Sequence, residues 1–455
     1  MLRKYIFEQM RAHPEKQMYE NGTVFRFQEA ADFAETFAAQ LKGPCCAILC
    51  RSELSAALAL LSCFAAGVPA VPLSFRYGEI HCKRILEMLK PPYMITDNAG
   101  RLQVKALEGG TYVNPPAGSP ALIMCTSGTT GVPKGAMLSA ENIYANLRGI
   151  EAYFPMGTKD RILILRPLYH CAVLTGEFLA ALAAGTDICF YSGPFHPSEA
   201  LRLIRTEQST VLCATPTMLQ LISRYAKARP PESLRYLVLS GECLAADAAE
   251  QIRRTFPEAD IYHVYGLTEA SPRVAYLPPE QFSRAPGCVG RPLNGITVKV
   301  TDAAGNTLPL GREGELWIKG PSVMMGYYNA PRQTADALKD GWLRTHDLAY
   351  LDEDGLIHIK CRMDDLIIRA GMNIYPQEIE HALRGDSRVA EALAYGIPDP
   401  FGGRKIGLLV KGTFADTAEV MALCREVLPS YEWPSRIALT DEIPKNGSGK
   451  MIRRK

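Results

Sequence analysis

Short apolar runs with strand character alternate with helical stretches up to residue 239, and this alternation limits the folds that the chain can adopt. The strand-like runs are Cys46–Leu49, Pro69–Leu73, Tyr93–Thr96, Ile162–Leu165, Ile188–Tyr191, Thr210–Cys213 and Tyr236–Leu239, with helices expected between them, as at Glu53–Ala66 and Ile80–Leu89. Asn21-Gly22 predicts a hairpin turn. Strands that alternate with helices form mostly parallel sheets covered on both faces. The pattern therefore predicts an α/β fold.

The sequence changes in character near residue 287. The runs Val298–Thr301, Gly314–Lys319 and Gly355–Lys360 resemble antiparallel strands joined by Gly- and Asp-rich turns. A shorter α+β piece follows Arg362 and is long enough for a small domain. The chain has 455 residues and no low-complexity linker, so we expect two domains joined by a tight hinge.

Composition and charge exclude several classes of protein. Apolar residues make up 47% and charged residues 22%, which excludes a disordered, collagen-like or coiled-coil chain. Fifty Lys and Arg against 48 Asp and Glu leave a formal charge of +2, so neither nucleic acid nor an anionic membrane is an expected partner. The uncharged run Ser55–Phe75 is interrupted by Gly67 and two prolines and predicts a buried helix and a strand, not a membrane span.

Thirteen cysteines include no C-x-x-C pair, which favours reduced thiols over a zinc or redox site. The N-terminal residues contain no apolar signal-peptide core. Both observations predict a cytoplasmic protein.

The most informative segment is an apolar strand, Ala121–Cys125, that continues into a loop of hydroxyl residues and glycines. The loop comprises Thr126, Ser127, Gly128, Thr129, Thr130, Gly131, Val132, Pro133, Lys134 and Gly135. Glycines let backbone N–H groups converge on an anion, hydroxyls add donors, and Lys134 adds a positive charge. The segment is not a P-loop, because Pro133 replaces the second glycine of that motif. We interpret it as a polyphosphate-binding loop, with a polar turn after a core strand as the alternative.

This loop resembles the phosphate loop of the adenylate-forming superfamily, which comprises acyl- and aryl-CoA synthetases, nonribosomal peptide adenylation domains and firefly luciferase. Other segments resemble further motifs of the family, in family order and over essentially the whole chain: Tyr265–Glu269, Gly341–Asp347, the hinge at Cys361–Asp365, Gly371–Glu380 after it, and the terminal lysine motif Asn446–Lys450. The resemblance implies a large N-terminal domain, residues 1–363, of layered, mostly parallel sheets with helices and a small β-barrel-like part. A small, mobile α+β domain, residues 364–455, would follow.

The implied reaction has two steps. A carboxylate attacks the α-phosphate of ATP to give an acyl-adenylate and pyrophosphate, and a thiol then takes the acyl group. By the resemblance, Lys450, Glu269 and Thr268 are catalytic, Glu269 also binds Mg²⁺, and Asp364 is the hinge. The residues expected to bind ATP are Thr126, Ser127, Gly128, Thr129, Thr130, Lys134, Gly241, Glu242, Tyr265, Asp347 and Arg362. After domain rotation, the loop Arg369–Ile374 would replace Lys450 at the site.

The acid is expected to lie among His170, Cys171, Ser240, Val264 and Ala270. The segment ending in His170 resembles the P-L-x-H of acyl- and aryl-CoA synthetases and has no Asp for an α-ammonium group, which disfavours an amino acid. Val264 stands where many relatives have Gly and favours a small or medium acid.

Other side chains near these motifs allow two interpretations. Arg166, Glu177 and Arg273 either recognise a polar group on the acid or are surface charges. The cysteines near the motifs are expected to be small core residues: Cys125, Cys171, Cys213 and Cys243.

Two departures from the family pattern are His346 and Cys361, where relatives have Gly and Gly or Asp. The acceptor thiol stays open between CoA and the phosphopantetheine of an acyl carrier protein. A luciferase-like oxygenase and an inactive nucleotide-binding homologue are alternatives of other classes. The sequence leaves the acid and the oligomeric state open.

Overall fold

A computed structural model gives the fold of the chain. It describes residues 1–75, 78–98, 100–114, 118–126, 133–226, 231–244, 246–282, 288–369, 372–398, 404–445 and 451–453. The chain divides into two compact units, described separately below. The large unit comprises Met1–Lys299, Trp317–Thr345 and Gly355–Ile357, and the small unit comprises Val300–Leu316, His346–Asp354 and His358–Lys455.

The main sheet of the large unit has the strand order β15-β14-β13-β12-β11-β9-β10-β1-β2. Its strands are β1 (Gln17–Glu20), β2 (Thr23–Arg26), β9 (Arg161–Ile164), β10 (Asp187–Phe190), β11 (Val211–Ala214), β12 (Tyr236–Ser240), β13 (Asp260–Gly266), β14 (Arg273–Leu277) and β15 (Cys288–Pro292). The central strands β1, β10, β9, β11, β12 and β13 form one parallel series. Both ends of this series continue into antiparallel strands. The predicted α/β class is confirmed.

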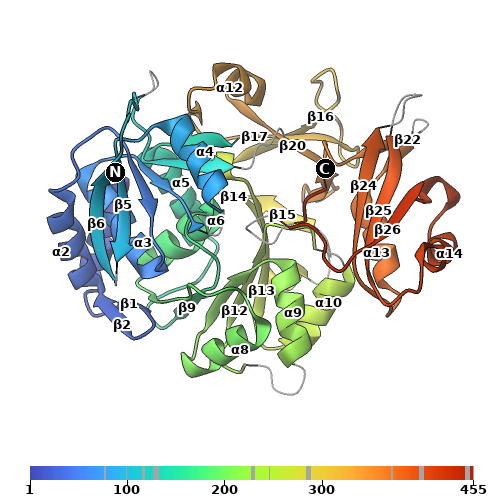
Figure 1. Cartoon of the computed structure of the whole chain (residues 1–455), viewed down its shortest axis with the longest axis horizontal. Coiled ribbons are helices and arrows are strands. Elements are labelled where there is room, and N and C mark those ends of the chain that lie inside the picture. The colour runs from blue at the N-terminus through green and yellow to red at the C-terminus, as the bar shows by residue number, and fades with distance from the viewer. Residues whose placement is uncertain are drawn as a thin grey trace. The chain divides into compact units, whose positions relative to one another are not determined.

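Helices cover this sheet because the connections between parallel strands must cross over its faces. Three of them, α8 (Pro197–Thr206), α9 (Pro216–Ala226) and α10 (Ala246–Thr255), pack on β9, β11 and β12 in one apolar core (Figure 1). Strand residues that alternate with those of this core, such as Ile162, Ile164 and Val238, are also buried. The sheet is therefore covered on both faces, as predicted. Further helices in contact with one another are α1 (Leu2–Ala12), α5 (Ala140–Glu151) and α7 (Ala180–Ala184).

A second sheet of the large unit has the order β18-β8-β7-β4-β3-β5-β6. Its strands are β3 (Cys46–Leu49), β4 (Ala70–Pro72), β5 (Tyr93–Asn98), β6 (Arg101–Ala106), β7 (Leu122–Thr126), β8 (Lys134–Leu138) and β18 (Gly326–Tyr327), and its helices include α3 (Glu53–Ala66) and α4 (Glu79–Leu89). Helix α3 begins where the Ser52 side chain accepts a hydrogen bond from Ser55 N, and it ends at Gly67, whose φ is +69°. The predicted strand at 46–49 and helix at 53–66 are thus confirmed with their bounds.

The remaining elements are short. They are α2 (Phe27–Ala38), α6 (Cys171–Val173), α11 (Pro279–Phe282), α12 (Pro331–Ala337), β19 (Leu338–Lys339), the π-helix Leu174–Leu179 and the 3₁₀ helices Thr268–Ala270 and Ser430–Glu432. The hairpin predicted at Asn21-Gly22 joins β1 and β2, and both residues have the positive φ that a tight two-residue turn requires.

Four strands contain residues of both units. They are β16 (Thr297–Thr301), β17 (Gly314–Lys319), β20 (Trp342–Leu351) and β21 (Ile357–Arg362). They correspond to the strands predicted after residue 287.

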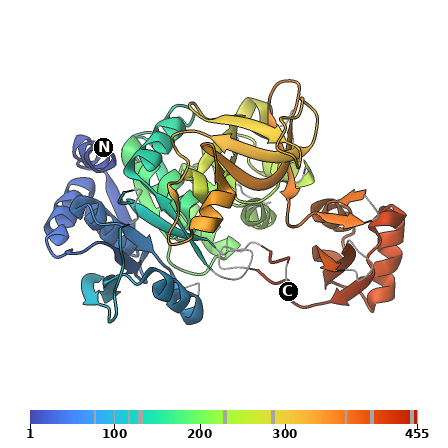
Figure 2. The same ribbon diagram turned by 90° about the horizontal axis from the view of Figure 1, so that it is seen from above.

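The small unit contains a sheet of three strands and a short hairpin. The sheet has the order β24 (Val389–Pro398), β25 (Arg404–Gly412) and β26 (Arg436–Leu439), and the hairpin consists of β22 (Ile367–Arg369) and β23 (Met372–Ile374). Helices α13 (Pro376–Arg384) and α14 (Thr417–Val427) pack on the sheet around one apolar core (Figure 2). This α+β arrangement matches the class predicted for the end of the chain.

The described end of the chain is fixed within the small unit by a buried ion pair. Lys445 and Met451 form an antiparallel bridge, and Ile452 N donates to Pro444 O at 2.9 Å. The Arg453 guanidinium pairs with the Glu380 carboxylate, with Nη2 at 3.0 Å from Oε2, and donates to Ala394 O at 2.9 Å. Both side chains are largely buried, at 13% and 4% exposed. The terminal segment is therefore held on both sides of residues 446–450.

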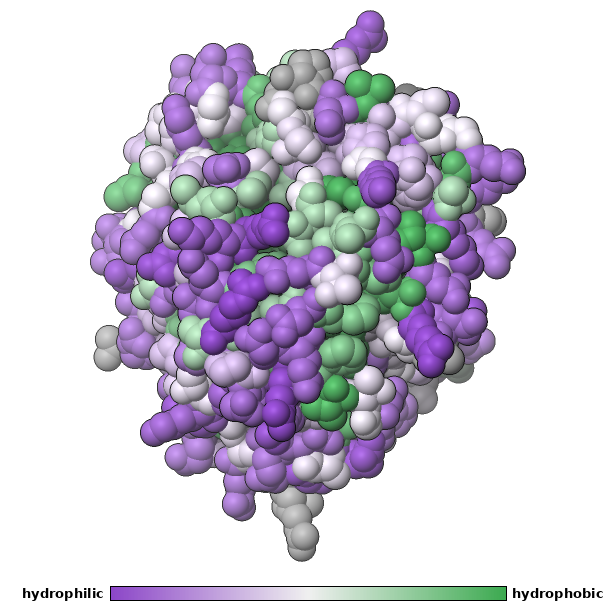
Figure 3. All heavy atoms as spheres, turned by 90° about the vertical axis from the view of Figure 1, so that its left-hand side faces the viewer, coloured by the Kyte–Doolittle hydropathy of each residue, from purple (hydrophilic) through white to green (hydrophobic). Residues whose placement is uncertain are grey.

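Among the helices that the structure describes, none has the length and apolar character needed to cross a lipid bilayer. One face of the large unit is mostly hydrophilic, with apolar residues gathered in its middle (Figure 3). All thirteen cysteines lie within the described residues, and none of them forms a disulfide bond. Cys125, Cys171 and Cys213 are buried as predicted, but Cys243 is exposed, so its prediction as a core residue is wrong. It lies in the loop after β12, where the chain leaves the sheet.

We expect Arg453→Ala to destabilise the small unit by about 3 kcal/mol, because it leaves the Glu380 carboxylate buried and without its cation. Native-state hydrogen exchange of the β24 and β25 amides would measure the loss. Arg436→Ala, at an exposed arginine of the same unit, is the matched control. Equal protection in Arg453→Ala and the control would contradict the prediction.

Candidate active site

The candidate site of the large unit lies at the carboxyl edge of its main sheet. Strands β9, β11, β12 and β13 run parallel, so the segments that follow them emerge at the same edge. These segments carry most of the residues predicted for the acid and for ATP: Arg166, His170 and Cys171 after β9, Gly241 and Glu242 after β12, and Thr268, Glu269 and Ala270 after β13.

The two ends of the predicted phosphate loop are paired in the second sheet. Thr126 of β7 and Lys134 of β8 are partners in an antiparallel ladder. Residues 127–132 and the side chain of Thr126 lie outside the described structure, so the contacts expected of Ser127, Gly128, Thr129 and Thr130 stay predictions. Lys134 Nζ lies 5.2 Å from the centre of the Tyr327 ring. Lys134 is therefore held where the two ends of the predicted loop pair with each other.

Tyr327 connects this lysine with Glu269. Its hydroxyl donates to Glu269 Oε1 at 2.7 Å, and Met324 N donates to Glu269 O at 2.9 Å. Strand β18, which contains Tyr327, pairs with β8 next to Lys134. The structure thus brings together two residues, Lys134 and Glu269, that are 135 positions apart (269 − 134). Tyr327 was not among the predicted site residues, since its position depends on strand pairing between distant segments.

Gly266 is required by the close approach of two backbone segments. A Cβ atom at this position would lie 2.0 Å from Pro272 O, and Leu267 N donates to the same carbonyl at 2.9 Å. No other residue fits such a contact. The turn places Thr268 and Glu269 in the 3₁₀ helix directly after β13. Tyr265, at the end of β13, is partly buried.

The loop after β12 combines a left-handed glycine with a fixed carboxylate. Gly241 has a φ of +92°, which favours glycine. Glu242 Oε2 accepts hydrogen bonds from Thr217 N at 3.1 Å and Thr217 Oγ1 at 2.7 Å, at the start of α9. The Glu242 side chain is thus engaged in the fold, which leaves its main chain for the predicted contact with the base.

The His263 side chain contacts the loop after β12. This histidine was not among the predicted site residues. Its Nδ1 lies 2.7 Å from Cys288 O, and its ring also bonds with the main chain of Glu242. Burial lowers the pKa of His263 to about 4, so the ring is neutral at pH 7. A lone histidine in the apolar strand β13 was the only signal in the sequence.

The residues present suit a magnesium ion that is shared with a substrate. Glu269 offers a partly exposed carboxylate, and carboxylate oxygen is a ligand that Mg²⁺ prefers. Within the described ranges, no three His, Cys, Asp or Glu side chains form a metal-binding group. An ion at Glu269 would therefore need phosphate oxygens and water as its other ligands, as is usual for Mg²⁺ bound with a nucleotide.

The predicted acid-site residues come from three neighbouring segments. His170 and Cys171 lie at the start of α6, Ser240 of β12 pairs with Val264 of β13, and Ala270 is buried in the 3₁₀ helix. Glu269 and Arg273 both act electrostatically on Cys171, and burial raises the pKa of this thiol to about 12. Cys171 is therefore a neutral, small residue close to the predicted metal ligand.

Arg166, Glu177 and Arg273 are not surface charges. Their exposed fractions are 8%, 0% and 3%. Arg166 Nη2 lies 3.2 Å from Ser240 Oγ and also pairs with the Glu177 carboxylate. The surface alternative left open by the sequence is thus excluded, and Arg166 contacts a residue predicted to line the acid site.

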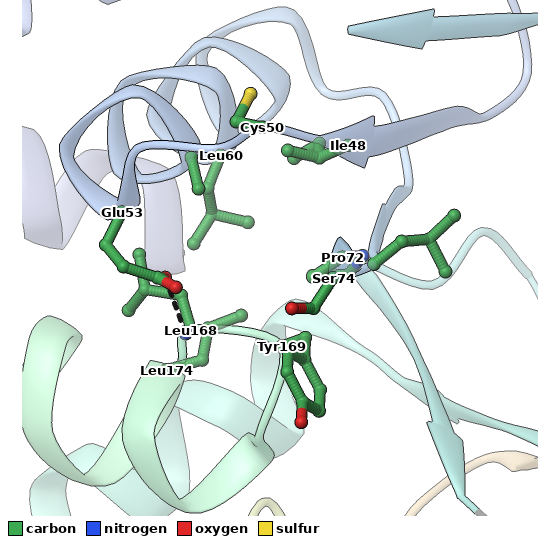
Figure 4. Close-up of a pocket in the computed structure, with 11 residues that line it drawn as sticks. Ile48, Cys50, Glu53, Leu60, Pro72, Ser74, Leu168, Tyr169 and Leu174 are labelled. Carbon is green, nitrogen blue, oxygen red and sulfur yellow. Dashed lines mark hydrogen bonds between the residues drawn. The ribbon is translucent and has the colours of Figure 1, made fainter. Parts of the chain in front are cut away.

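A separate pocket lies at the ends of β3 and β4 in the large unit (Figure 4). Its lining is mostly apolar and includes Leu168, Tyr169 and Leu174 from the segment that also carries His170 and Cys171. Glu53 Oε2 accepts from Leu168 N at 2.9 Å and fixes this segment against α3. None of the predicted site residues lines this pocket.

In the small unit, the structure pairs two predicted ATP ligands. Asp347 on β20 and Arg362 on β21 form an ion pair with an N–O distance of 3.1 Å. His346 has a φ of +56°, in the left-handed region that favours glycine, and its ring lies 3.4 Å from the Glu315 carboxylate. Cys361 is buried, and the Asp364 carbonyl accepts from Arg404 Nη1 at 2.9 Å. Lys450 lies outside the described residues, and its role stays a prediction.

Comparison with known proteins covers almost the whole chain. Residues 6–328 match the family model described as AMP-binding enzyme, and residues 378–450 match that of the AMP-binding enzyme C-terminal domain. Feruloyl-CoA synthase of an Amycolatopsis species is 32% identical over 418 residues, which cover 87% of this chain and 84% of that protein. The 2-succinylbenzoate–CoA ligase of Bacillus licheniformis is 32% identical over 432 residues, with 91% and 89% covered.

Solved structures show the same similarity. The O-succinylbenzoate Coenzyme A synthetase (MenE) of Bacillus subtilis, in complex with ATP and a magnesium ion, superposes with a TM-score of 0.86 at 28% identity. The match covers 99% of this chain and 98% of that protein.

We expect the free energy of unfolding to fall by about 2 kcal/mol between pH 7 and pH 5 through His263 alone. The folded pKa is about 4 and the unfolded pKa about 6.5, so the unfolded chain binds the extra proton in this range and stability is lost as the pH falls. Urea unfolding at both pH values would measure it. His263→Gln should reduce the difference between the two values, and an unchanged difference would contradict the assignment.

Proposed function

Because the chain belongs to the AMP-binding enzyme family and is an AMP-forming acid–CoA ligase, we propose that it activates a small or medium carboxylic acid at the carboxyl edge of its main sheet. The observation that carries this assignment is the Lys134–Tyr327–Glu269 contact, which joins the phosphate loop to the predicted metal ligand. An α-amino acid is not the substrate, since no carboxylate occupies the position after β9 that would bind its ammonium group.

In the first step, a carboxylate oxygen of the acid bonds to the α-phosphorus of ATP. The bond from this phosphorus to the β-phosphate oxygen breaks, and pyrophosphate leaves with the electron pair. Two anions must meet, so the barrier is largely electrostatic. Lys134 and the donors of Thr126–Thr130 bind the β- and γ-phosphates, Thr268 binds the α-phosphate, and Lys450 bridges the acid and the α-phosphate.

Four of the predicted ATP ligands would bind the nucleoside. The Tyr265 ring stacks on adenine beside the main chain of Gly241 and Glu242. Asp347 accepts from the ribose hydroxyls, because one carboxylate offers acceptors to two neighbouring donors. Glu269 holds a magnesium ion, which supplies positive charge to the phosphates when bound.

In the second step, the thiol sulfur of CoA bonds to the acyl carbon, AMP leaves, and the thiol proton passes to solvent. We propose that residues 364–455 form the mobile domain and that rotation at Asp364 removes Lys450 before this step. Delivery to a carrier-protein phosphopantetheine is the second candidate, because it presents the same thiol arm. The intact Lys134, Glu269 and Asp347 disfavour an inactive homologue, and no feature favours a luciferase-like oxygenase.

Acid-dependent pyrophosphate exchange across a panel of carboxylic acids tests this function. We expect exchange with at least one non-amino acid, and AMP release that then depends on CoA. The same assay with a phosphopantetheine-loaded carrier protein separates the two acceptors. Absence of exchange with every acid would overturn the proposal and favour the inactive homologue.

Lys450→Ala should abolish pyrophosphate exchange but spare thioester formation from a supplied acyl-adenylate. The reason is that the lysine acts only while the carboxylate and the α-phosphate are brought together. Single-turnover assays of each half-reaction would measure both effects, with Lys445→Ala, at a nearby lysine of the same terminal segment, as the control. Equal loss of both half-reactions would contradict the domain rotation.

A further inference from the structure

Two arginines and one glutamate form a buried cluster at the acid site. Arg166 follows β9, Glu177 lies in the π-helix Leu174–Leu179, and Arg273 begins β14. The Glu177 carboxylate pairs with Arg166, which also donates to Ser240. A π-helical turn is rare and frequently marks a functional site. Here the π-helix lies between α6 and α7, and it carries Glu177, whose carboxylate pairs with Arg166.

Arg273 forms no close ion pair within the described chain, although the Glu177 carboxylate attracts it electrostatically. It is 3% exposed, no described carboxylate forms an ion pair with it, and its Nε has no hydrogen-bond partner. Its guanidinium bonds with the hydroxyl of Tyr153 and packs on Gly176, where an added Cβ atom would lie 3.1 Å from Nη2. Burial raises the pKa of Tyr153 to about 12, so this partner is neutral. The cluster therefore carries one uncompensated positive charge.

The cluster lies next to the groups that would perform the reaction. Arg273 is the ladder partner of Gly266, at the turn that places Glu269. Arg273 and Glu269 both act on Cys171, and Arg166 Nη1 lies 4.0 Å from the position of a Cβ atom at Gly241. The main chain of residues 270–273 is fixed, because Asn146 Nδ2 donates to Ala270 O and to Arg273 O. The Arg273 guanidinium is thus held close to the residues that are predicted to bind the acid and adenine.

A buried guanidinium without a counter-ion is costly to fold unless a bound anion compensates it. We propose that the acid is a dicarboxylate: one carboxylate is adenylated, and the other binds as the counter-ion of Arg273. This inference rests on the proposed function and specifies its substrate. The planar fork of a guanidinium matches a carboxylate with two parallel hydrogen bonds. Because the cluster holds two guanidinium groups and one carboxylate, which acts on both of them, its charge balance fits one additional carboxylate and not two.

The test compares pairs of acids that differ only in the second carboxylate, such as an aromatic or short aliphatic dicarboxylate and its monoamide. The amide group has nearly the same size as the second carboxylate but carries no charge. For the wild type we expect kcat/KM in acid-dependent pyrophosphate exchange to be roughly 100-fold higher with the diacid. This comparison uses the unaltered chain and does not depend on whether a variant folds.

Arg273→Met should remove most of this preference, raise KM for the diacid, and leave KM for ATP unchanged. Arg273→Lys keeps the charge without the fork and should retain part of the preference. Arg291→Met, at an exposed arginine of the same sheet, is the matched control. A shift in selectivity, with the melting temperature retained, is a result that a merely structural role of Arg273 would not produce.

Three results would overturn the inference. The first is a wild type with a higher kcat/KM for monocarboxylates. The second is an Arg273→Met variant whose kcat/KM falls equally with all acids. The third is a rise in KM for ATP in this variant, which would assign the arginine to the nucleotide. In each of these cases the ligase function stands. If no acid of either kind supports exchange, the ligase function itself fails, so the two failures are distinguishable.

Discussion

The parallel pairing of β9, β11, β12 and β13 is the constraint on which the candidate site depends. Parallel neighbours require crossover connections, so each strand ends at the same edge and each following segment begins there. This geometry brings the predicted site residues between Arg166 and Ala270 to one edge of the sheet without long loops. The helices that bury the two faces of the sheet keep the edge rigid, and the chemistry is left to the segments beyond the strands.

The contact of Tyr327 with Glu269 adds the second sheet to this edge. Strand β18 pairs with β8, so the same short strand positions a partner for the Lys134 side chain and a donor for the Glu269 carboxylate. A cation and a carboxylate that are both predicted to act on a polyphosphate thereby contact the same tyrosine side chain. The geometry suits a site in which the missing ligands come from the substrate.

The sequence predicted those parts of the fold that depend on local pattern. The strand Cys46–Leu49 and the helix Glu53–Ala66 have clear periodicity and end signals, and the motif residues could be identified by their chemistry. It did not predict the π-helix Leu174–Leu179, because residues 174–183 are buried on every side and show no apolar periodicity in which an extra residue could be detected. It also left Arg166, Glu177 and Arg273 open, since charged residues are usually exposed and only tertiary packing shows that these are buried.

The buried state of Cys171 has a consequence for the chemistry beside it. An acyl-adenylate is an electrophile, and a thiolate within reach would capture the acyl group and inactivate the protein by self-acylation. Burial raises the pKa of Cys171 well above its usual range, so the thiol stays protonated at pH 7, and this form is a poor nucleophile. The apolar packing around Cys171 thus keeps this thiol from attacking the acyl-adenylate before an external thiol arrives.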